Sequence, residues 1–256
     1  MARIGTLDWM HVFVDVPPDA ASATRTFWSR ALGWETGPQW TQHPEFRSLT
    51  PGTGDRYVHV QEIDGEPRVH LDVVVDDLDT ARDALRDLGA EAAPRTAEWQ
   101  VMRSPGGLPF CLCREPAAGV RPTGTQHADG HRSRLVQVCI DAPAGLFDRE
   151  VAFWRAATGW DYRTSAHNPE LADLRGPATA PLRLLMQRLG ADDPGTTTRA
   201  HIDLGADDLD AEADRLVSLG AQKVAPGKGY LDRTRGWVVM ADPTGLPFCV
   251  TSKPPD

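Results

Sequence analysis

The sequence repeats itself, and this repetition constrains the fold more strongly than any other feature. Three segments of the first half recur in the second half: 14–34 as 140–160, 70–79 as 201–210, and 107–111 as 245–249. The first pair shares the dipeptides Phe-Trp and Gly-Trp, and the last pair shares the run Gly-Leu-Pro-Phe-Cys. A repeat of this length indicates two copies of one domain, each long enough to bury a core of its own.

The spacing between matched segments predicts the domain bounds. It grows from 126 residues to 131 and then to 138, so the second copy carries insertions near 192–198 and 227–235, which are expected to be loops. The stretch that joins the copies is rich in Pro, Gly, Thr and His and lacks apolar periodicity. We therefore expect domain 1 at 6–115, a linker at 116–133 and domain 2 at 134–253.

Each copy shows a strand followed by a helix twice. Residues 70–76 alternate polar and apolar side chains, which is the pattern of a half-buried strand. A helix is expected directly after this strand, capped by Asp77 or Asp79 and ended by Gly89, which suits a left-handed stop. Residues 208–220 repeat the arrangement. The pattern predicts an α+β fold.

The expected strands have one apolar face and one polar face. The apolar face should pack under the helix, which leaves the polar face free to line a cleft. In the first strand of each copy that polar face carries His11, Phe13 and Asp15, and Gln137, Cys139 and Asp141.

Composition excludes several classes of partner. A formal net charge of -9 and a pI near 5.3 would repel nucleic acid and anionic membranes, so neither is expected as a partner. No apolar run approaches the roughly 20 residues that span a bilayer, and the first residues lack a secretory pattern, so a cytoplasmic protein is expected. The four cysteines lack zinc-knuckle spacing and are expected to be reduced thiols.

Taken together, these motifs resemble one known superfamily. The likeness rests on Phe-Trp through Leu-Gly-Trp at 27–34, on His-Leu-Asp at 70–72 with Asp-Asp-Leu-Asp at 76–79, and on Asp-Pro-Thr-Gly-Leu-Pro-Phe-Cys-Val at 242–250. They are similar to the vicinal oxygen chelate superfamily of glyoxalase I, bleomycin-resistance proteins, extradiol dioxygenases and fosfomycin-resistance enzymes. The resemblance implies two tandem glyoxalase-like domains, each of two βαβββ modules that form an incomplete barrel around a cleft.

The resemblance also implies where metal ligands would lie, at the start of the first strand and on the fourth strand of each module. Those positions in domain 1 could hold one divalent metal, such as zinc, iron, manganese or nickel. In domain 2 two of the four are neutral amides, so no metal is expected there. The positions are His11, Gln61, His70 and Cys111 in domain 1, and Gln137, Gln187, His201 and Cys249 in domain 2.

The residue types at these positions disfavour the best-known reactions of the superfamily. Glyoxalase-type isomerisation needs a metal and a carboxylate that moves a proton, yet the fourth-strand positions hold Gln61 and Cys111. Extradiol oxygenation needs two histidines and one carboxylate on iron, and neither domain offers that carboxylate there. An enzyme on this fold would need other chemistry, for which His11, His59 and His70 are the catalytic candidates.

Structural roles could explain several of the same side chains. His70 and His201 could each hydrogen-bond a neighbouring module and fix a strand. Cys111 and Cys249 are typical of small buried core residues. His59 could equally be an exposed residue on an edge strand.

Aromatic and polar side chains predict where a small organic molecule would bind. Six of the eight tryptophans occupy matched positions in the two copies, as core residues would. Trp9 and Trp40 have no match and are the better candidates for stacking on an aromatic ligand. The expected ligand-binding residues are Trp9, Phe13, Trp40, Gln61, Asp72, Gln137, Gln187 and His201.

Three functions remain open at this point, because a fold does not determine a function. The first is a protein that binds or sequesters a small organic molecule, as bleomycin-resistance proteins do. The second is an enzyme acting as a lyase, isomerase or oxygenase in the cleft of domain 1, with or without a divalent metal. The third is an interaction scaffold. Either a monomer or a homodimer is compatible with the sequence.

Overall fold

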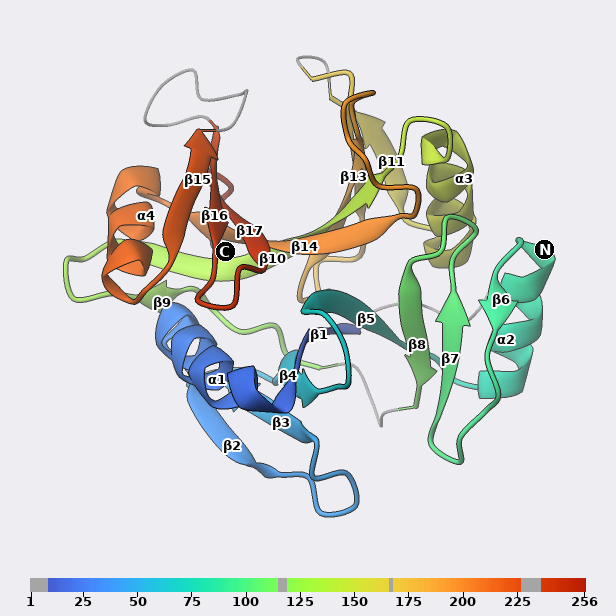
Figure 1. The fold of residues 1–256 in the computed structure, drawn as a ribbon, viewed down its shortest axis with the longest axis horizontal. Coiled ribbons are helices and arrows are strands. Elements are labelled where there is room, and N and C mark those ends of the chain that lie inside the picture. The colour runs from blue at the N-terminus through green and yellow to red at the C-terminus, as the bar shows by residue number, and fades with distance from the viewer. Residues whose placement is uncertain (1–8, 115–118, 166–167, 227–235) are drawn as a thin grey trace. The chain divides into compact units, whose positions relative to one another are not determined.

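The computed structural model describes residues 9–114, 119–165, 168–226 and 236–256 (Figure 1). The expected insertion at 227–235 and residues 116–118 of the expected linker lie outside the described residues. The other expected insertion forms a loop between β13 (Arg183–Arg188) and β14 (Arg199–Ala206), as predicted.

The described chain contains four consecutive βαβββ modules, as predicted (Figure 1). Module 1 (10–62) consists of β1 (Met10–Val16), α1 (Pro18–Leu32), β2 (Glu35–Gln39), β3 (Phe46–Thr50) and β4 (Val58–Glu62). Module 2 (68–113) consists of β5 (Arg68–Val74), α2 (Leu78–Asp87), β6 (Glu91–Ala92), β7 (Trp99–Arg103) and β8 (Pro109–Cys113).

The second repeat has the same succession of elements. Module 3 (132–188) consists of β10 (Arg132–Ala142), α3 (Phe147–Thr158), β11 (Asp161–Thr164), β12 (Leu171–Arg175) and β13. Module 4 (199–251) consists of β14, α4 (Leu209–Ser218), β15 (Gln222–Pro226), β16 (Trp237–Ala241) and β17 (Pro247–Thr251). A short strand within the expected linker, β9 (Thr125–Gln126), pairs with the start of β10.

Each repeat contributes one open sheet, and the expected α+β class is confirmed. The first sheet has the order β2-β3-β4-β1-β5-β8-β7-β6, and the second has the order β11-β12-β13-β10-β14-β17-β16-β15 with β9 beside β10. Within modules 2 and 4 the first and last strands pair in parallel, β5 with β8 and β14 with β17. Neither sheet closes into a full barrel.

By its internal contacts the chain forms two compact units, and their boundaries fall inside β1, β5, β10 and β14. Unit 1 comprises Met1–Val12, His70–Gly119 and Val138–Ala200, and therefore holds most of modules 2 and 3. Unit 2 comprises Phe13–Val69, Val120–Gln137 and His201–Asp256, and holds most of modules 1 and 4. Each unit thus combines a module from one repeat with a module from the other.

Helix α2 forms where the sequence predicts it. The Asp77 carboxylate caps the helix by accepting a hydrogen bond of 2.8 Å from the Thr80 amide. Leu78, Ala81 and Leu85 form its buried stripe, and Gly89 has the left-handed φ of 97° that the helix end requires. In α4, Asp208 caps the helix through the Ala211 amide in the same way.

In unit 1 a buried glutamate connects α3 to the β7–β8 turn. Glu150 is fully buried, and its Oε2 accepts a hydrogen bond of 2.9 Å from the Trp154 indole. Its Oε1 accepts hydrogen bonds from the Ser104 hydroxyl at 2.7 Å and from the Gly106 amide. Phe110 of β8 packs edge-on against the Trp154 ring. Burial raises the pKa of Glu150, so these donors compensate for the lost hydration of its carboxylate.

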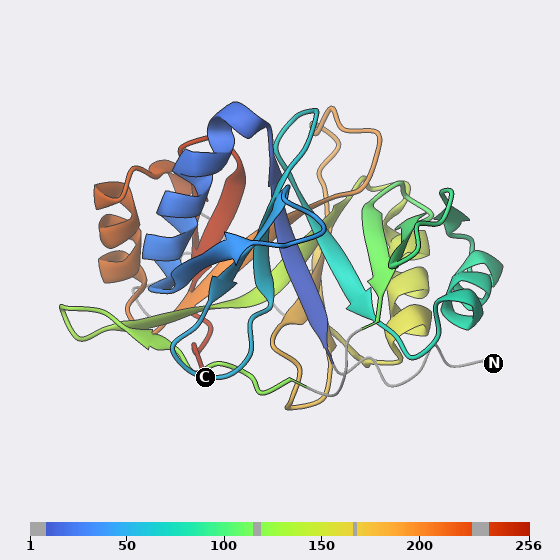
Figure 2. The same ribbon diagram turned by 90° about the horizontal axis from the view of Figure 1, so that it is seen from below.

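In unit 2 the indole of Trp28, the repeat counterpart of Trp154, binds a carboxylate from a turn and not from its own helix. Trp28 of α1 donates a hydrogen bond of 3.1 Å to Asp242, which lies in the β16–β17 turn. The other oxygen of Asp242 accepts from the amides of Thr244 and Leu246 at 2.8 and 3.1 Å. Helices α1 and α4, both in this unit, lie side by side (Figure 2), where Arg215 donates a hydrogen bond of 2.7 Å to the Ala31 carbonyl.

The buried carboxylate therefore lies on the helix in unit 1 and in the β-turn in unit 2, and we call this difference the exchange. Thr24 of α1 occupies the repeat position of Glu150, and Ser104 occupies the repeat position of Asp242. Each unit then has one buried acid at this junction. Pairing α3 with the Asp242 turn would bury two like charges together, whereas pairing α1 with the Ser104 turn would leave the Trp28 indole without a carboxylate. The exchange favours the observed pairing of modules in each unit.

We expect Glu150→Thr to lower the free energy of unfolding by about 3 kcal/mol, because three buried donors, among them the Trp154 indole, lose their acceptor. Adding Ser104→Asp should recover more than half of that loss, because it recreates the arrangement of unit 2. Urea denaturation monitored by tryptophan fluorescence measures both changes.

The matched control is Asp148→Ala, in the first turn of the same helix, whose side chain is 86% exposed and which should change the stability little. A double variant no more stable than Glu150→Thr alone would contradict the exchange.

Candidate functional site

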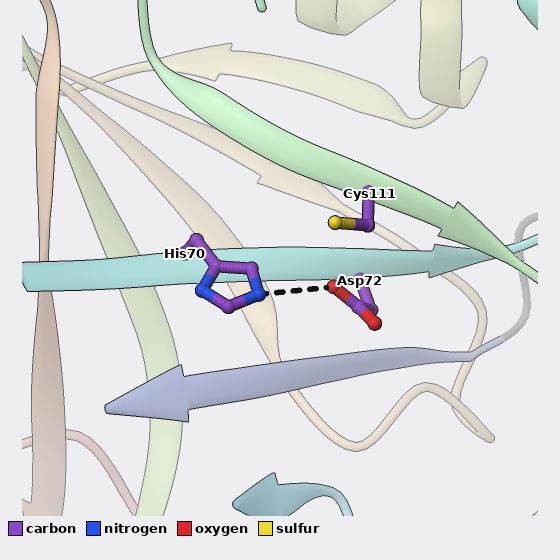
Figure 3. Close-up of side chains that lie close together, drawn as sticks. All are labelled: His70, Asp72 and Cys111. Carbon is purple, nitrogen blue, oxygen red and sulfur yellow. Dashed lines mark ion pairs between the residues drawn. The ribbon is translucent and has the colours of Figure 1, made fainter. Parts of the chain in front are cut away.

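The pairing of β5 with β8 brings three metal-ligating side chains together in unit 1. His70 and Asp72 are two residues apart on β5, so their side chains leave the same face of the strand. The register of the parallel pair sets Asp72 beside Cys111 of β8. One ligand atom from each of the three residues lies within 4.8 Å of the others (Figure 3).

The His70 and Asp72 side chains form an ion-pair contact, with Nε2 and Oδ1 3.2 Å apart, and both are largely buried. The pKa of the Cys111 thiol is raised to about 11, chiefly because burial penalises the thiolate and secondly because the Asp72 carboxylate repels it. Without a bound cation Cys111 is therefore a neutral thiol at physiological pH.

The donor set of this cluster fits a divalent metal. Asp72 Oδ1 is buried, and its contact is with His70 Nε2, itself a candidate ligand, so a metal ion could replace that contact. Imidazole, carboxylate and thiolate together suit borderline cations such as zinc or iron better than magnesium or calcium. His70, Asp72 and Cys111 are the residues that would hold the ion.

The same three residue types meet at the matching position of unit 2. Nε2 of His201 lies 3.3 Å from Asp203 Oδ1 and 3.6 Å from the Cys249 sulfur, and the register of β14 and β17 sets Asp203 beside Cys249. Here the Gln137 amide donates a hydrogen bond to the other Asp203 oxygen. Sequence reasoning expected no metal in domain 2, yet its residues also form a possible ligand cluster.

The structure distributes the expected metal set of domain 1 over both units. His11 lies in unit 1 with His70 and Cys111, and it is 2% exposed, with the Trp9 ring edge-on at 6.4 Å. Gln61 of β4 lies in unit 2 and is half-buried. The residue that completes the cluster is Asp72, which the sequence had suggested only as a ligand-binding residue.

Three expected site residues, His59, Phe13 and Trp40, meet in an aromatic cluster in unit 2. His59 stacks on Phe13 with 4.6 Å between ring centroids, and Trp40 lies edge-on to it at 5.5 Å. The Ser48 hydroxyl lies 3.0 Å from His59 Nδ1 and accepts a hydrogen bond of 3.0 Å from the Trp40 indole. His59 is 1% exposed on a strand between two others, so the alternative of an exposed edge residue is wrong.

The two remaining expected ligand-binding residues, Gln187 and Trp9, lie in unit 1. Gln187 of β13 accepts from the Cys139 thiol at 3.6 Å, and the same sulfur lies 3.5 Å from an Asp141 oxygen. Trp9 is buried and packs directly on Gly119: a Cβ atom added to Gly119 would come within 2.7 Å of the indole ring. None of the four cysteines forms a disulfide, as predicted.

Sequence reasoning missed a second kind of cluster, formed by His127, His131 and Glu212 in unit 2. The two histidines fall in the expected linker, where a lack of apolar periodicity gave no structural signal. Glu212 offered one, because it occupies a position in the buried stripe of α4 beside Leu209, Ala213 and Leu216. A charged residue at a core position of a helix predicts a buried partner.

Comparison with known proteins identifies the family. The sequence matches the glyoxalase-like domain family over residues 11–113 and 137–251, which together make up most of the chain. The chain belongs to the glyoxalase-like domain family. Both matched stretches follow the sequence repeat, and a search of curated proteins returns no match.

Solved structures of a glyoxalase, a dioxygenase and a synthase share the fold that the resemblance implied. The Mn(II)-bound glyoxalase from Novosphingobium aromaticivorans has a TM-score of 0.68 at 17% identity, covering 94% of this chain and 80% of that one. For the halotolerant catechol dioxygenase BphC the TM-score is 0.58 at 14% identity, with coverage of 94% and 85%. A mutant of 4-hydroxymandelate synthase from Streptomyces coelicolor has a TM-score of 0.58 at 18% identity, covering 94% of this chain and 91% of that one.

These identities establish a common fold and nothing finer. None of the helices in the described part of the chain combines the length and the apolar character needed to cross a bilayer.

We expect Asp72→Asn to lower the pKa of the Cys111 thiol in chelator-treated protein, because it removes the negative charge that opposes the thiolate. Alkylation of Cys111 by iodoacetamide at pH 9 should accelerate accordingly, and peptide mapping by mass spectrometry measures it residue by residue. Asp76→Asn, an exposed carboxylate just after β5, is the control and should leave the rate unchanged. Equal rates in wild type and Asp72→Asn would refute this electrostatic coupling.

Proposed function

We propose that this protein binds a small organic molecule through a divalent metal held by His70, Asp72 and Cys111. The observation that supports the proposal is the convergence of the three ligand atoms within 4.8 Å, with a buried Asp72 oxygen whose contact is with another candidate ligand, His70. A bound divalent cation supplies a Lewis acid that attracts oxygen atoms of the ligand.

Three protein ligands leave coordination positions open, and that is the arrangement of metal sites that bind a further molecule. A ligand with two adjacent oxygen atoms, such as a catechol, could occupy two such positions. The names of two structural neighbours, a Mn(II)-bound glyoxalase and a catechol dioxygenase, support both a metal and an oxygen-bearing ligand. The same open positions favour a second candidate function, an enzyme that transforms the molecule it binds.

The residues of the site also predict how metal binding depends on pH. Cys111 must lose its proton before its sulfur can coordinate, and its raised pKa makes that loss unfavourable in the metal-free protein. Metal binding should therefore release a proton and strengthen as the pH rises. A proton on His70 Nε2 would block that nitrogen as a metal ligand, and Asp72, 3.2 Å away, would stabilise the protonated imidazole.

We expect Cys111→Ser protein purified without chelators to contain close to one zinc, iron or manganese ion per chain less than the wild type, as measured by elemental analysis. Cys111→Ser should lower the affinity for the metal by about tenfold or more, because it replaces a thiolate with a poor ligand. Cys113→Ser is the matched control, two residues further along β8 and outside the cluster.

Catechol serves as the probe for the organic ligand. Its absorption should shift on binding to metal-loaded wild type and to Cys113→Ser, and the shift should be lost after chelation and in the His70→Ala, Cys111→Ser double variant. A wild-type protein that stays metal-free after reconstitution with zinc, iron and manganese would refute the proposal. Oxygen uptake or a change in the catechol spectrum over time would favour the enzyme.

A further inference from the structure

A second cluster of metal-ligating side chains lies in unit 2, away from the His-Asp-Cys clusters on the sheets. His127 and His131 flank the turn that joins β9 to β10, and Glu212 faces them from α4. The family positions that carry metal ligands include none of these three residues. One ligand atom from each lies within 4.8 Å of the others.

The turn holds both imidazoles on the same side. The His127 amide donates to the His131 carbonyl at 2.9 Å, and Gly130 adopts the positive φ of 97° that closes the turn. The two rings lie 4.7 Å apart at an angle of 37°. A rigid hairpin turn therefore sets the spacing of the two nitrogen ligands before anything binds.

Four donor atoms converge at this point, two of nitrogen and two of oxygen. Nε2 of His131 lies 2.7 Å from Glu212 Oε2, and Nε2 of His127 lies 3.8 Å from the same oxygen. The Ser133 hydroxyl lies 2.8 Å from His127 Nε2. In a tetrahedral zinc site the ligand atoms are about 3.3 Å apart, as bonds near 2.0 Å imply. The three separations bracket that value, so small side-chain shifts would admit the ion.

Two further residues, Asp129 and Arg215, hydrogen-bond the candidate ligands, as polar groups around known metal sites do. Asp129 lies 2.5 Å from Nδ1 of His131 and would direct the other nitrogen toward the ion. Arg215 donates two hydrogen bonds of 2.8 Å to the Glu212 carboxylate and so fixes its orientation. These contacts leave Nε2 of His131 and Oε2 of Glu212 directed at each other.

The side chains of this cluster are largely buried. The Glu212 side chain has no accessible surface, and the His131 side chain is 4% exposed. The Arg215 guanidinium, hydrogen-bonded to the Glu212 carboxylate, lowers the pKa of Glu212 against the opposing effect of burial. Burial and the Arg215 charge lower the pKa of His127.

We propose that His127, His131 and Glu212, with Ser133 or water as the fourth ligand, form a zinc site that clips the β9–β10 hairpin to α4. Two imidazoles and a carboxylate select zinc over magnesium and calcium, which require oxygen ligands, and the absence of sulfur from the set disfavours copper(I). With Ser133 as the fourth ligand, the protein fills all four positions, so the site is structural and stabilises unit 2.

The test uses Cys111→Ser, Cys139→Ser, Cys249→Ser full-length protein, in which every candidate ligand cluster that contains a cysteine has lost its sulfur ligand. Zinc titration against a chromophoric chelator should still give one tight site per chain, and zinc should raise the melting temperature. His127→Gln and, separately, Glu212→Gln should weaken that site by about tenfold or more. Both changes keep a hydrogen-bonding side chain, so circular dichroism should show that the variants remain folded.

His43→Gln is the control, because His43 lies in the same unit but outside the cluster and pairs with Glu45 instead. Cobalt(II) distinguishes the His127–His131–Glu212 cluster from the His70–Asp72–Cys111 cluster. Both should give visible d–d bands with cobalt, but only the Cys111 site should also show a sulfur-to-cobalt charge-transfer band. Absence of a tight zinc site in this cysteine variant, or equal weakening by His43→Gln and His127→Gln, would overturn the proposal and assign the cluster to a metal-free ion-pair network.

Discussion

The parallel pairing of the first and last strands in modules 2 and 4 is the constraint on which the candidate site depends. It sets Asp72 beside Cys111, and Asp203 beside Cys249. Because side chains alternate along a strand, His70 then shares the face of Asp72, and a slip of one residue would turn both away from the sulfur. Parallel strands need a crossover, and α2, capped by Asp77, is part of the connection that supplies it here.

Buried carboxylates organise the rest of each unit. Glu150 in unit 1 and Asp242 in unit 2 each accept hydrogen bonds from an indole and from a β-turn, and Glu212 joins α4 to a hairpin through His131. An ionised group in a core is costly unless every lone pair is engaged, so each of these acids restricts what can pack against it. Repeats with almost the same apolar pattern therefore pair selectively, because their acids lie in different elements.

Much of the fold follows from local pattern. The cap at Asp77, the stop at Gly89 and the alternation along β5 are short-range features that appear in the sequence as they do in the structure. The site was only partly predictable. His70 and Cys111 came from the family resemblance, whereas the part played by Asp72 came from the register between β5 and β8, which no local pattern encodes. Likewise, His127 and Glu212 are 85 residues apart, and only folding brings them together.

By itself, the sequence determined the duplication, the strand followed by a helix twice in each copy and the residue types available for metal chemistry, because periodicity, caps and turns act over a few residues. Tertiary structure decided which of those residues meet. It packed His59 against Phe13 and Trp40, gave Asp203 a Gln137 partner that Asp72 does not share, and set each buried acid beside an indole of its own unit. These outcomes depend on strand register and on the desolvation of charges, which exist only once distant segments have packed.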